Sequence, residues 1–319
     1  MSGYKFALVG AAGYVAPRHM RAIKETGNEL VAALDRSDSV GVIDSYFPES
    51  AFFVEFERFD RHLDLLARKG HRVDYVSIVS PNYLHDSHIR FALRHKAHAI
   101  CEKPLVLNPH NIDALQVVQD ETGCKVYNIL QLRLHPVVID FKKKIQAELR
   151  ENPDKVVDID LTYITSRGRW YAISWKGDES KSGGVATNIG VHFFDMLTWI
   201  FGDVTDSQVH HNSPDTCSGL LSFNNARVRW FLSTNADYLA GIDQDSAMRT
   251  HRSITVNGEE LEFSGGFTDL HTLSYEHILS GQGFELGEAK PSIEIVSNIR
   301  QIEVKRSQSD EHPFMAKVG

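Results

Sequence analysis

The sequence predicts an α/β domain with a parallel sheet, followed by an α+β domain whose open sheet is largely antiparallel. Two observations lead to this. Short apolar segments alternate with helix-like segments as far as residue 128, as in a parallel sheet. Beyond that point, segments with a period of two follow one another with no helices between them. We therefore divide the chain into predicted domains 1–128 and 129–319.

Length and composition limit the classes of function that the chain can have. A chain of 319 residues is long enough for two domains, and its net charge of −8 argues against a nucleic-acid partner, because phosphate binding needs a basic face. The three cysteines, Cys101, Cys124 and Cys217, are widely spaced, which indicates a reducing compartment and no metal site. We expect no signal peptide, because the given sequence enters a strand-like segment almost at once, and no membrane span, because no apolar run approaches ~20 residues. We expect a cytoplasmic protein with no membrane partner.

The expected elements of the first half follow in chain order. A strand at Tyr4–Gly10 leads through a glycine turn to a helix at Pro17–Lys24, and a second strand spans Glu29–Leu34. Residues 39–71 form an excursion that contains an amphipathic helix at Phe59–Arg68. The remaining strands, with helices between them, are expected at Tyr75–Val79, Ala97–Cys101 and Lys125–Ile129. The helix that begins at Asn108-Pro109 is expected to stop at Gly123.

The turn Gly10–Val15 has the composition of a phosphate-binding turn. Backbone N–H groups in a glycine turn between a strand and a helix meet a pyrophosphate. Of the three glycines in GxGxxG, only the first is kept, as Gly10; Ala12 and Val15 occupy the other two positions. Gly13 is a candidate for the residue whose backbone approaches the pyrophosphate closely. An ordinary strand-to-helix turn remains an open alternative.

Asp35 follows the second strand, roughly 20 residues after the turn, where an acid holds the adenosine ribose of a dinucleotide. Its charge repels a 2′-phosphate, so NAD is favoured over NADP. The alternative is an aspartate that caps the next turn.

Two further strand ends carry polar residues. Ser80–His85 follows one strand, and Glu102-Lys103-Pro104 follows the next. Ligands bind at the carboxyl ends of the strands in an open α/β sheet, so Lys103 is expected to face the ligand. A surface lysine at a strand end is the alternative.

The second half is expected to contain strands at Val156–Ile164, Gly219–Phe223, Ala226–Ser233 and Ser253–Phe263. Asn224-Asn225 and Asn257-Gly258 are hairpin signals. A glycine-rich segment opens a helix that runs to about Ile200 and carries Asn188 and His192, four residues apart and hence on one face. A core histidine bonded to Asp195 is the alternative interpretation of this pair.

A basic, aromatic loop covers residues 166–176. Arg167, Arg169 and Lys176 lie in it among three aromatic residues, and they are suited to anionic groups of a substrate. The alternative is a solvated linker. Arg227 and Arg229 alternate on a strand and are expected to form surface ion pairs.

The glycine turn, Glu102-Lys103-Pro104 and the Gly184…Asn188…His192 helix together resemble the glucose–fructose oxidoreductase, inositol dehydrogenase and rhizopine-catabolism family over nearly the whole chain. The resemblance implies a Rossmann domain for NAD, a second open-sheet domain, and a homodimer or homotetramer. It also implies that Lys103 and His192 are the catalytic residues. The family often has aspartate where this chain has Asn188, so proton transfer falls to Lys103 and His192.

Three stretches, at residues 11–19, 128–133 and 162–168, resemble one subgroup of that family, the UDP-N-acetylglucosaminuronic acid dehydrogenases of O-antigen and lipopolysaccharide synthesis. The resemblance implies NAD-dependent oxidation of the sugar 3-hydroxyl, with 2-oxoglutarate as a candidate partner that reoxidises NADH. Dehydrogenases of free aldoses or inositols, NAD-dependent glycosidases and non-catalytic NAD(H)-binding regulators are the alternatives.

The expected site residues fall into two groups. Those for the cofactor are Gly10, Ala12, Gly13, Tyr14, Val15, Asp35, Ser80, Asn82, Leu84, His85, Glu102, Lys103 and Gln131. Those for the substrate are Lys103, Arg167, Arg169, Lys176, Asn188 and His192.

Overall fold

The computed structural model describes residues 3–240, 242, 249–261, 265, 267–307 and 309–318. The chain divides into two compact units. Unit 1 comprises Met1–Leu134 and Thr268–Lys290, and unit 2 comprises His135–Phe267 and Pro291–Gly319. Both units are therefore built from two separate stretches of sequence.

Unit 1 contains a six-stranded parallel sheet in the order β3-β2-β1-β4-β5-β6. Its strands are β1 (Lys5–Val9), β2 (Glu29–Leu34), β3 (Ala51–Phe53), β4 (Tyr75–Ile78), β5 (His98–Cys101) and β6 (Val126–Asn128). The strand order reverses between β1 and β4, and such a switch point is where open α/β sheets bind ligands at their carboxyl ends. The predicted Rossmann-type sheet is confirmed.

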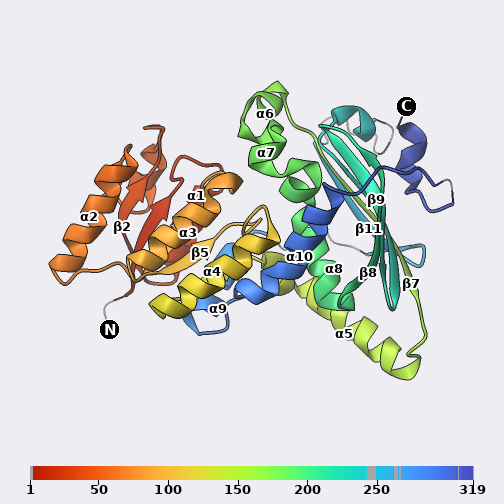
Figure 1. The fold of residues 1–319 in the computed structure, drawn as a ribbon, viewed down its shortest axis with the longest axis horizontal. Helices are drawn as coiled ribbons and strands as arrows, with labels where there is room; N and C mark the ends of the chain where they lie inside the picture. Colours follow the sequence, from red (N-terminus) through yellow and green to blue (C-terminus); the bar gives the residue numbers. More distant parts are fainter. Residues whose placement is uncertain are drawn as a thin grey trace. The chain divides into compact units, whose positions relative to one another are not determined.

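Helices connect and accompany these strands (Figure 1). They are α1 (Ala16–Glu25), α2 (Phe56–Arg68), α3 (His85–Arg94), α4 (Pro109–Thr122) and α9 (Leu270–Leu279), with 3₁₀ turns at η1 (Gly41–Ser45), η2 (Asn82–Leu84) and η3 (Gln131–Leu134). Gly123 ends α4 in the left-handed conformation, with φ of 72°, as predicted. The core joins Phe6 and Leu8 of β1 to Met20 of α1 and to Tyr275 and Ile278 of α9.

Strand β3 was not predicted. It lies in the excursion over residues 39–71 and pairs in parallel with β2 through Ala51–Phe53. A strand of three residues is too short to show a period of two, and its two phenylalanines gave only a packing signal.

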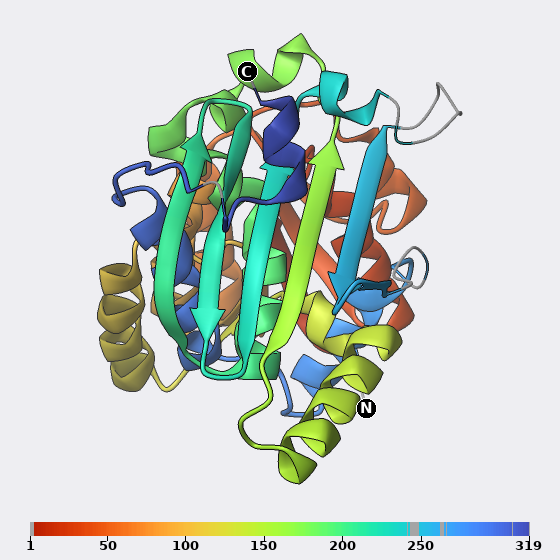
Figure 2. The same ribbon diagram turned by 90° about the vertical axis from the view of Figure 1, so that its right-hand side faces the viewer.

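Unit 2 contains a second six-stranded sheet, in the order β12-β11-β7-β10-β9-β8 (Figure 2). Its strands are β7 (Val157–Thr165), β8 (Val204–Asn212), β9 (Thr216–Phe223), β10 (Ala226–Ser233), β11 (Thr250–Val256) and β12 (Glu259–Glu260). Within the described strands, β7 and β10 run parallel and the other pairs are antiparallel. The prediction of an open, largely antiparallel sheet is confirmed.

Both hairpin signals mark turns of this sheet. Asn224-Asn225 joins β9 to β10, and Asn257-Gly258 joins β11 to β12 with φ of 52° and 86°. Positive φ at both positions is the geometry that asparagine–glycine turns favour. The predicted strand Ser253–Phe263 is thus two short strands, and its last residues, Glu262 and Phe263, lie outside the described residues.

The helices of unit 2 are α5 (Pro136–Glu151), α6 (Arg169–Ile173), α7 (Glu179–Ser182) and α8 (Val191–Phe201), with short turns η4 (Trp175–Gly177), η5 (Ala186–Gly190), η6 (Ala236–Leu239) and η7 (Pro313–Lys317). Phe194 of α8 packs edge-on against Trp230 of β10, with ring centroids 5.4 Å apart. The neighbouring Phe231 points to the other sheet face and packs with Met315 of η7. The helix α10 (Leu286–Ile299) begins in unit 1 and ends in unit 2, where the division falls at Lys290/Pro291.

Candidate active site

The turn after β1 has the backbone geometry of a phosphate-binding turn. Gly10 has φ of 94°, and a Cβ on it would lie 2.6 Å from the carbonyl carbon of Val79, so only glycine fits there. Gly13 donates its N–H to the Gly10 carbonyl over 3.1 Å and closes the turn. The α1 helix starts immediately after Val15, so its N-terminal end follows the turn directly.

The carboxylate of Asp35 accepts a hydrogen bond from this turn. Its Oδ2 accepts the Ala12 N–H over 2.9 Å, and its Oδ1 accepts the Ser37 N–H over 2.9 Å. The second bond is the turn cap that was the alternative interpretation of Asp35. Each oxygen still has a second lone pair, so the cap leaves room for a ribose hydroxyl.

The loop after β4 is tied to the loop after β5 through His85. One ring nitrogen of His85 lies 2.8 Å from the Ser80 carbonyl oxygen and the other lies 2.7 Å from the Pro104 carbonyl oxygen. Burial lowers the pKa of His85, and the hydrogen bonds to the two carbonyl oxygens oppose that shift. The Ser80 hydroxyl lies 2.8 Å from Nδ1 of His88, whose pKa burial lowers to about 4. The His85 contacts hold the backbone just after Lys103 against the loop after β4.

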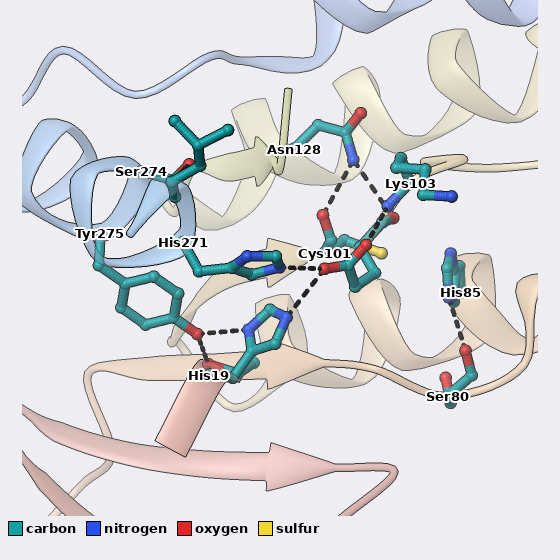
Figure 3. Close-up of polar contacts among 12 residues, drawn as sticks. His19, Ser80, His85, Cys101, Lys103, Asn128, His271, Ser274 and Tyr275 are labelled. Carbon is teal, nitrogen blue, oxygen red and sulfur yellow. Dashed lines mark hydrogen bonds and ion pairs between the residues drawn. The ribbon is translucent and has the colours of Figure 1, made fainter. Parts of the chain in front are cut away.

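Lys103 itself is half-buried at the end of β5 (Figure 3). The peptide bond between Lys103 and Pro104 is cis. The side chain of Asn128, at the end of β6, donates to the carbonyl oxygens of Cys101 and Glu102 over 2.9 and 3.2 Å. The residue before Lys103 is therefore held by the neighbouring strand as well as by its own.

The side-chain oxygen of Gln131, Oε1, in η3, is buried and accepts no hydrogen bond from the described residues. A buried acceptor without a donor carries a desolvation cost of about 1–3 kcal/mol, so such an atom is typical of a site that a ligand completes. Asn82 is buried in η2, Leu84 is partly buried there, and Tyr14 of the glycine turn is 88% exposed.

The side chain of Glu102 lies in a buried cluster that the sequence did not reveal. Its Oε1 is 3.0 Å from Nε2 of His19 and 2.9 Å from Nε2 of His271. His19 had no assigned role, and 169 residues separate His271 from Glu102, so no local pattern links them. Ligand atoms of the three residues lie within 4.8 Å of one another, a separation that also suits a metal ion. Hydrogen bonds account for the arrangement, because both imidazole nitrogens lie at bonding distance from the same carboxylate oxygen.

In unit 2, Asn188 and His192 are both half-buried, whereas Asp195 is fully buried. The segment before α8 is a π-helical turn, η5, which the sequence did not predict and which contains Asn188. Such turns are often found at functional sites. The Asn188 side-chain amide donates to the Tyr171 hydroxyl, and burial raises the pKa of Tyr171.

The basic loop of unit 2 is mainly exposed. Arg167 and Arg169 are exposed, and the Lys176 ammonium lies 3.9 Å from the centre of the Trp175 ring. Arg229 forms two bonds to Asp160, of 2.6 and 2.8 Å, and Arg227 lies 2.6 Å from Asp310. The predicted ion pairs of Arg227 and Arg229 are confirmed, so both guanidinium groups already have carboxylate partners.

Unit 1 therefore fits a dinucleotide. An acid stands at the end of β2, a glycine turn at the end of β1, and a polar pair of loops at the ends of β4 and β5. Gln131, in the turn after β6, adds a buried Oε1 that has no donor among the described residues.

Comparison with known proteins supports this assignment. Residues 4–129 match the model of an oxidoreductase family with an NAD-binding Rossmann fold, and residues 154–258 match the model of its C-terminal alpha/beta domain. The WlbA (WbpB) dehydrogenase from Thermus thermophilus, solved with NAD and UDP-GlcNAcA, is 48% identical; the alignment covers 98% of this chain and 99% of that one, with a TM-score of 0.92. A second structure of that enzyme, with NAD and alpha-ketoglutarate, has a TM-score of 0.93.

Curated relatives are more distant. The 2,7-anhydro-N-acetylneuraminate hydratase of Escherichia coli (strain K12) is 24% identical over 192 residues, which are 57% of this chain and 48% of that protein. The chain thus spans about half the length of the curated relatives it matches. No helix in the described ranges is long and apolar enough to cross a membrane.

Proposed function

Because the chain belongs to the oxidoreductase family with an NAD-binding Rossmann fold and a C-terminal alpha/beta domain, we propose that it oxidises a nucleotide sugar with NAD. This membership confirms the resemblance on which the sequence-based expectation rested. The proposed substrate is UDP-N-acetylglucosaminuronic acid (UDP-GlcNAcA), and the proposed reaction is oxidation of its 3-hydroxyl. The process it would serve is O-antigen and lipopolysaccharide synthesis in the cytoplasm.

One observation carries the proposal. The similarity to the Thermus thermophilus dehydrogenase extends over 98% of the chain at 48% identity, and that enzyme was solved with both NAD and UDP-GlcNAcA. The second structure of that enzyme holds alpha-ketoglutarate (2-oxoglutarate), which supports 2-oxoglutarate as the partner that reoxidises NADH. Reduction of its keto group would give the 2-hydroxy acid.

NAD, when bound, accepts the hydride from the sugar carbon. The chain supplies binding, orientation and proton handling. Residues Gly10–Val15 take the pyrophosphate, Asp35 takes the adenosine ribose, and Gln131 Oε1 takes a donor from the second nucleoside. In the proposed division of labour, domain 1–128 binds the cofactor together with Gln131 just beyond it, and domain 129–319 binds the sugar and joins the homodimer or homotetramer.

Lys103 and His192 handle the hydroxyl proton. As the hydride leaves the carbon, one of the two removes the proton from the oxygen and a carbonyl forms. Arg167, Arg169 and Lys176 supply positive charge for the diphosphate or the uronate carboxylate. Asn188 supplies a neutral amide where a carboxylate would repel this anionic sugar.

Absorbance at the reduced-nicotinamide band tests the function. Purified protein with bound NAD is mixed with UDP-GlcNAcA, and 2-oxoglutarate is then added. We expect reduction on the first addition and reoxidation on the second. UDP-N-acetylglucosamine, which lacks the carboxylate, is the matched control and is expected to react more slowly. No reduction with cofactor demonstrably bound would overturn the substrate assignment, and reduction without reoxidation would remove 2-oxoglutarate from the proposal.

A further inference from the structure

Three side chains from distant parts of unit 1 meet inside it. Glu102 directly follows β5, His19 lies in the first turn of α1, and His271 lies in the first turn of α9. The three residues are 7%, 0% and 4% exposed, respectively. Oε1 of Glu102 accepts hydrogen bonds from both imidazoles. Figure 3 shows the rings of His19 and His271 turned toward their shared bonding partner near Cys101, where two dashed lines meet.

The protonation states follow from the donors and acceptors. Burial would raise the pKa of Glu102, but the bonds from His19 and His271 outweigh it and hold that pKa well below its usual range. An ionised carboxylate only accepts, so Nε2 of each imidazole must carry a proton and donate it. Burial also lowers the pKa of His19, so this ring is neutral and its Nδ1 accepts.

The rest of the network is then determined. Tyr275 donates its hydroxyl proton to Nδ1 of His19 over 2.8 Å, and Ser77 donates to the Tyr275 oxygen over 2.6 Å. Each of these groups has a partner with the correct donor or acceptor role. These buried hydrogen bonds make the network rigid, because rotation of one of its side chains would break at least one of them.

The two oxygens of Glu102 serve different residues. Oε1 accepts both imidazoles, and Oε2 accepts the backbone N–H of Lys103 over 3.2 Å. The position of Oε2, and with it the Lys103 backbone, is therefore set by helices α1 and α9 through the carboxylate. The Asn128 amide holds the Glu102 carbonyl from the other side.

We propose that His19 and His271 are positioning residues for Lys103 and act on it through Glu102. Neither imidazole needs to touch the sugar or the cofactor. The inference rests on the proposed catalytic role of Lys103 and goes beyond it, because it assigns a role in turnover to two residues outside the expected site. A displacement of about 1 Å at a reacting group can cost ~10²-fold in rate.

A double-mutant cycle tests the inference in the whole protein with NAD and UDP-GlcNAcA. His271→Leu removes one of the two donors to Oε1, Lys103→Ala removes the positioned amine, and the double variant carries both changes. His271→Gln places an amide N–H near the former Nε2 and is the conservative rescue. His277→Leu, on the same helix but outside the network, is the matched control.

We expect His271→Leu to lower kcat by roughly 10- to 100-fold while the sugar KM and the Kd for NAD stay within about threefold, because misplacement of Lys103 affects the reacting centre alone. His271→Gln should recover most of the rate. In the Lys103→Ala background, His271→Leu should cause little further loss, since two changes that act through one residue do not add. A full, additive loss in that background would overturn the inference.

The cycle also separates this inference from the proposed function. Near-wild-type turnover of Lys103→Ala would remove the catalytic role of Lys103, and the inference would fall with it. Slow Lys103→Ala combined with an unaffected His271→Leu would overturn the inference alone. If His271→Leu fails to fold, Glu102→Gln replaces it in the cycle, because glutamine keeps an acceptor for both imidazoles but places a donor against the Lys103 N–H. The same criterion of non-additivity then applies.

Discussion

At the scale of single residues, the proposed chemistry depends on two side chains carried by different units. Lys103 lies two residues after the end of β5 in unit 1, and His192 lies in the first turn of α8 in unit 2. Each is half-buried, which suits a group that must exchange a proton with a substrate. Their backbones are held differently: Lys103 by Glu102 and the loops on either side of it, and His192 by the helix that follows a π-turn.

Lys103→Ala and His192→Ala should each lower turnover by about 10²- to 10⁴-fold, the usual contribution of positioned acid–base groups. Binding of NAD should remain within a few-fold, because the glycine turn and Asp35 are untouched. Steady-state kinetics and calorimetric titration with NAD measure the two effects. Lys69→Ala and His277→Ala serve as controls of the same residue types, and wild-type turnover in both active-site variants would contradict the assignment.

Gly10→Ala should disable cofactor binding. The added Cβ would lie 2.6 Å from the Val79 carbonyl carbon, so the turn or β4 must move. We expect at least tenfold weaker NAD binding and a loss of about 1–3 kcal/mol in the free energy of unfolding.

Gly27→Ala is the control that separates the steric clash of an added Cβ from backbone strain. Gly27 has φ of 76°, close to the conformation of Gly10, but a Cβ there meets nothing within 4 Å. Strain alone should therefore give a smaller loss of stability and unchanged NAD binding. Equal effects of the two substitutions on NAD binding would contradict a steric role for Gly10.

At the scale of elements, the sequence predicted most of the fold, whereas the contacts around Glu102 emerge only from the structure. Alternation of strands with helices predicted the sheet of unit 1, and Glu102-Lys103-Pro104 pointed to the end of β5. The sequence did not predict that α9 packs in unit 1, because α9 is far from the strands of that unit along the chain. The π-turn η5 was missed as well, because an extra residue per turn leaves no distinct pattern in a short segment.

The pairing of β8 with β9 contains an irregularity that one glycine permits. The register shifts between Val209 and His211, which leaves His210 as the extra residue of a bulge. Opposite it, a Cβ on Gly219 would lie 2.1 Å from the Gln208 carbonyl oxygen and 2.7 Å from the Trp230 ring. The bulged strand and the buried indole both occupy the space that a side chain would need.

Gly219→Ala should therefore destabilise unit 2. We expect a loss of about 1–3 kcal/mol or more in the free energy of unfolding, since a buried ring and a backbone carbonyl cannot both move aside. Urea unfolding followed by tryptophan fluorescence is the measurement, and Ser222→Ala on the same strand is the control. Stability within about 0.5 kcal/mol of the unsubstituted protein would show that the bulge relaxes without cost.

At the scale of the whole molecule, buried neutral histidines link stability to pH. Burial lowers the pKa of His88 to about 4 and that of His312 to about 3; His312 is held by the Phe314 N–H at Nδ1 and by Thr162 at Nε2. An unfolded histidine takes up its proton near pH 6.5. Between that pH and about 4, the unfolded state therefore binds more protons than the folded state.

Stability should fall as the pH drops through this window. Each of the two histidines contributes a slope of about 1.4 kcal/mol per pH unit, and the stability it provides is fully present above pH ~6.5. Urea midpoints at pH 7.5 and pH 5 measure the difference, and His312→Gln should reduce the slope by one group. A midpoint that rises on acidification would contradict this account.

The discontinuity of unit 1 has a consequence for synthesis. Its core and the partners of Glu102 include residues of Thr268–Lys290, which leave the ribosome long after β6. At a typical elongation rate of about 5–20 residues per second, the first six strands would wait roughly 10–30 s for α9. During that interval Glu102 lacks the hydrogen bond from His271, and the core of unit 1 lacks the Tyr275 ring. The part of the unit 1 core that Tyr275 and Ile278 complete therefore stays open until residues 268–290 have been synthesised.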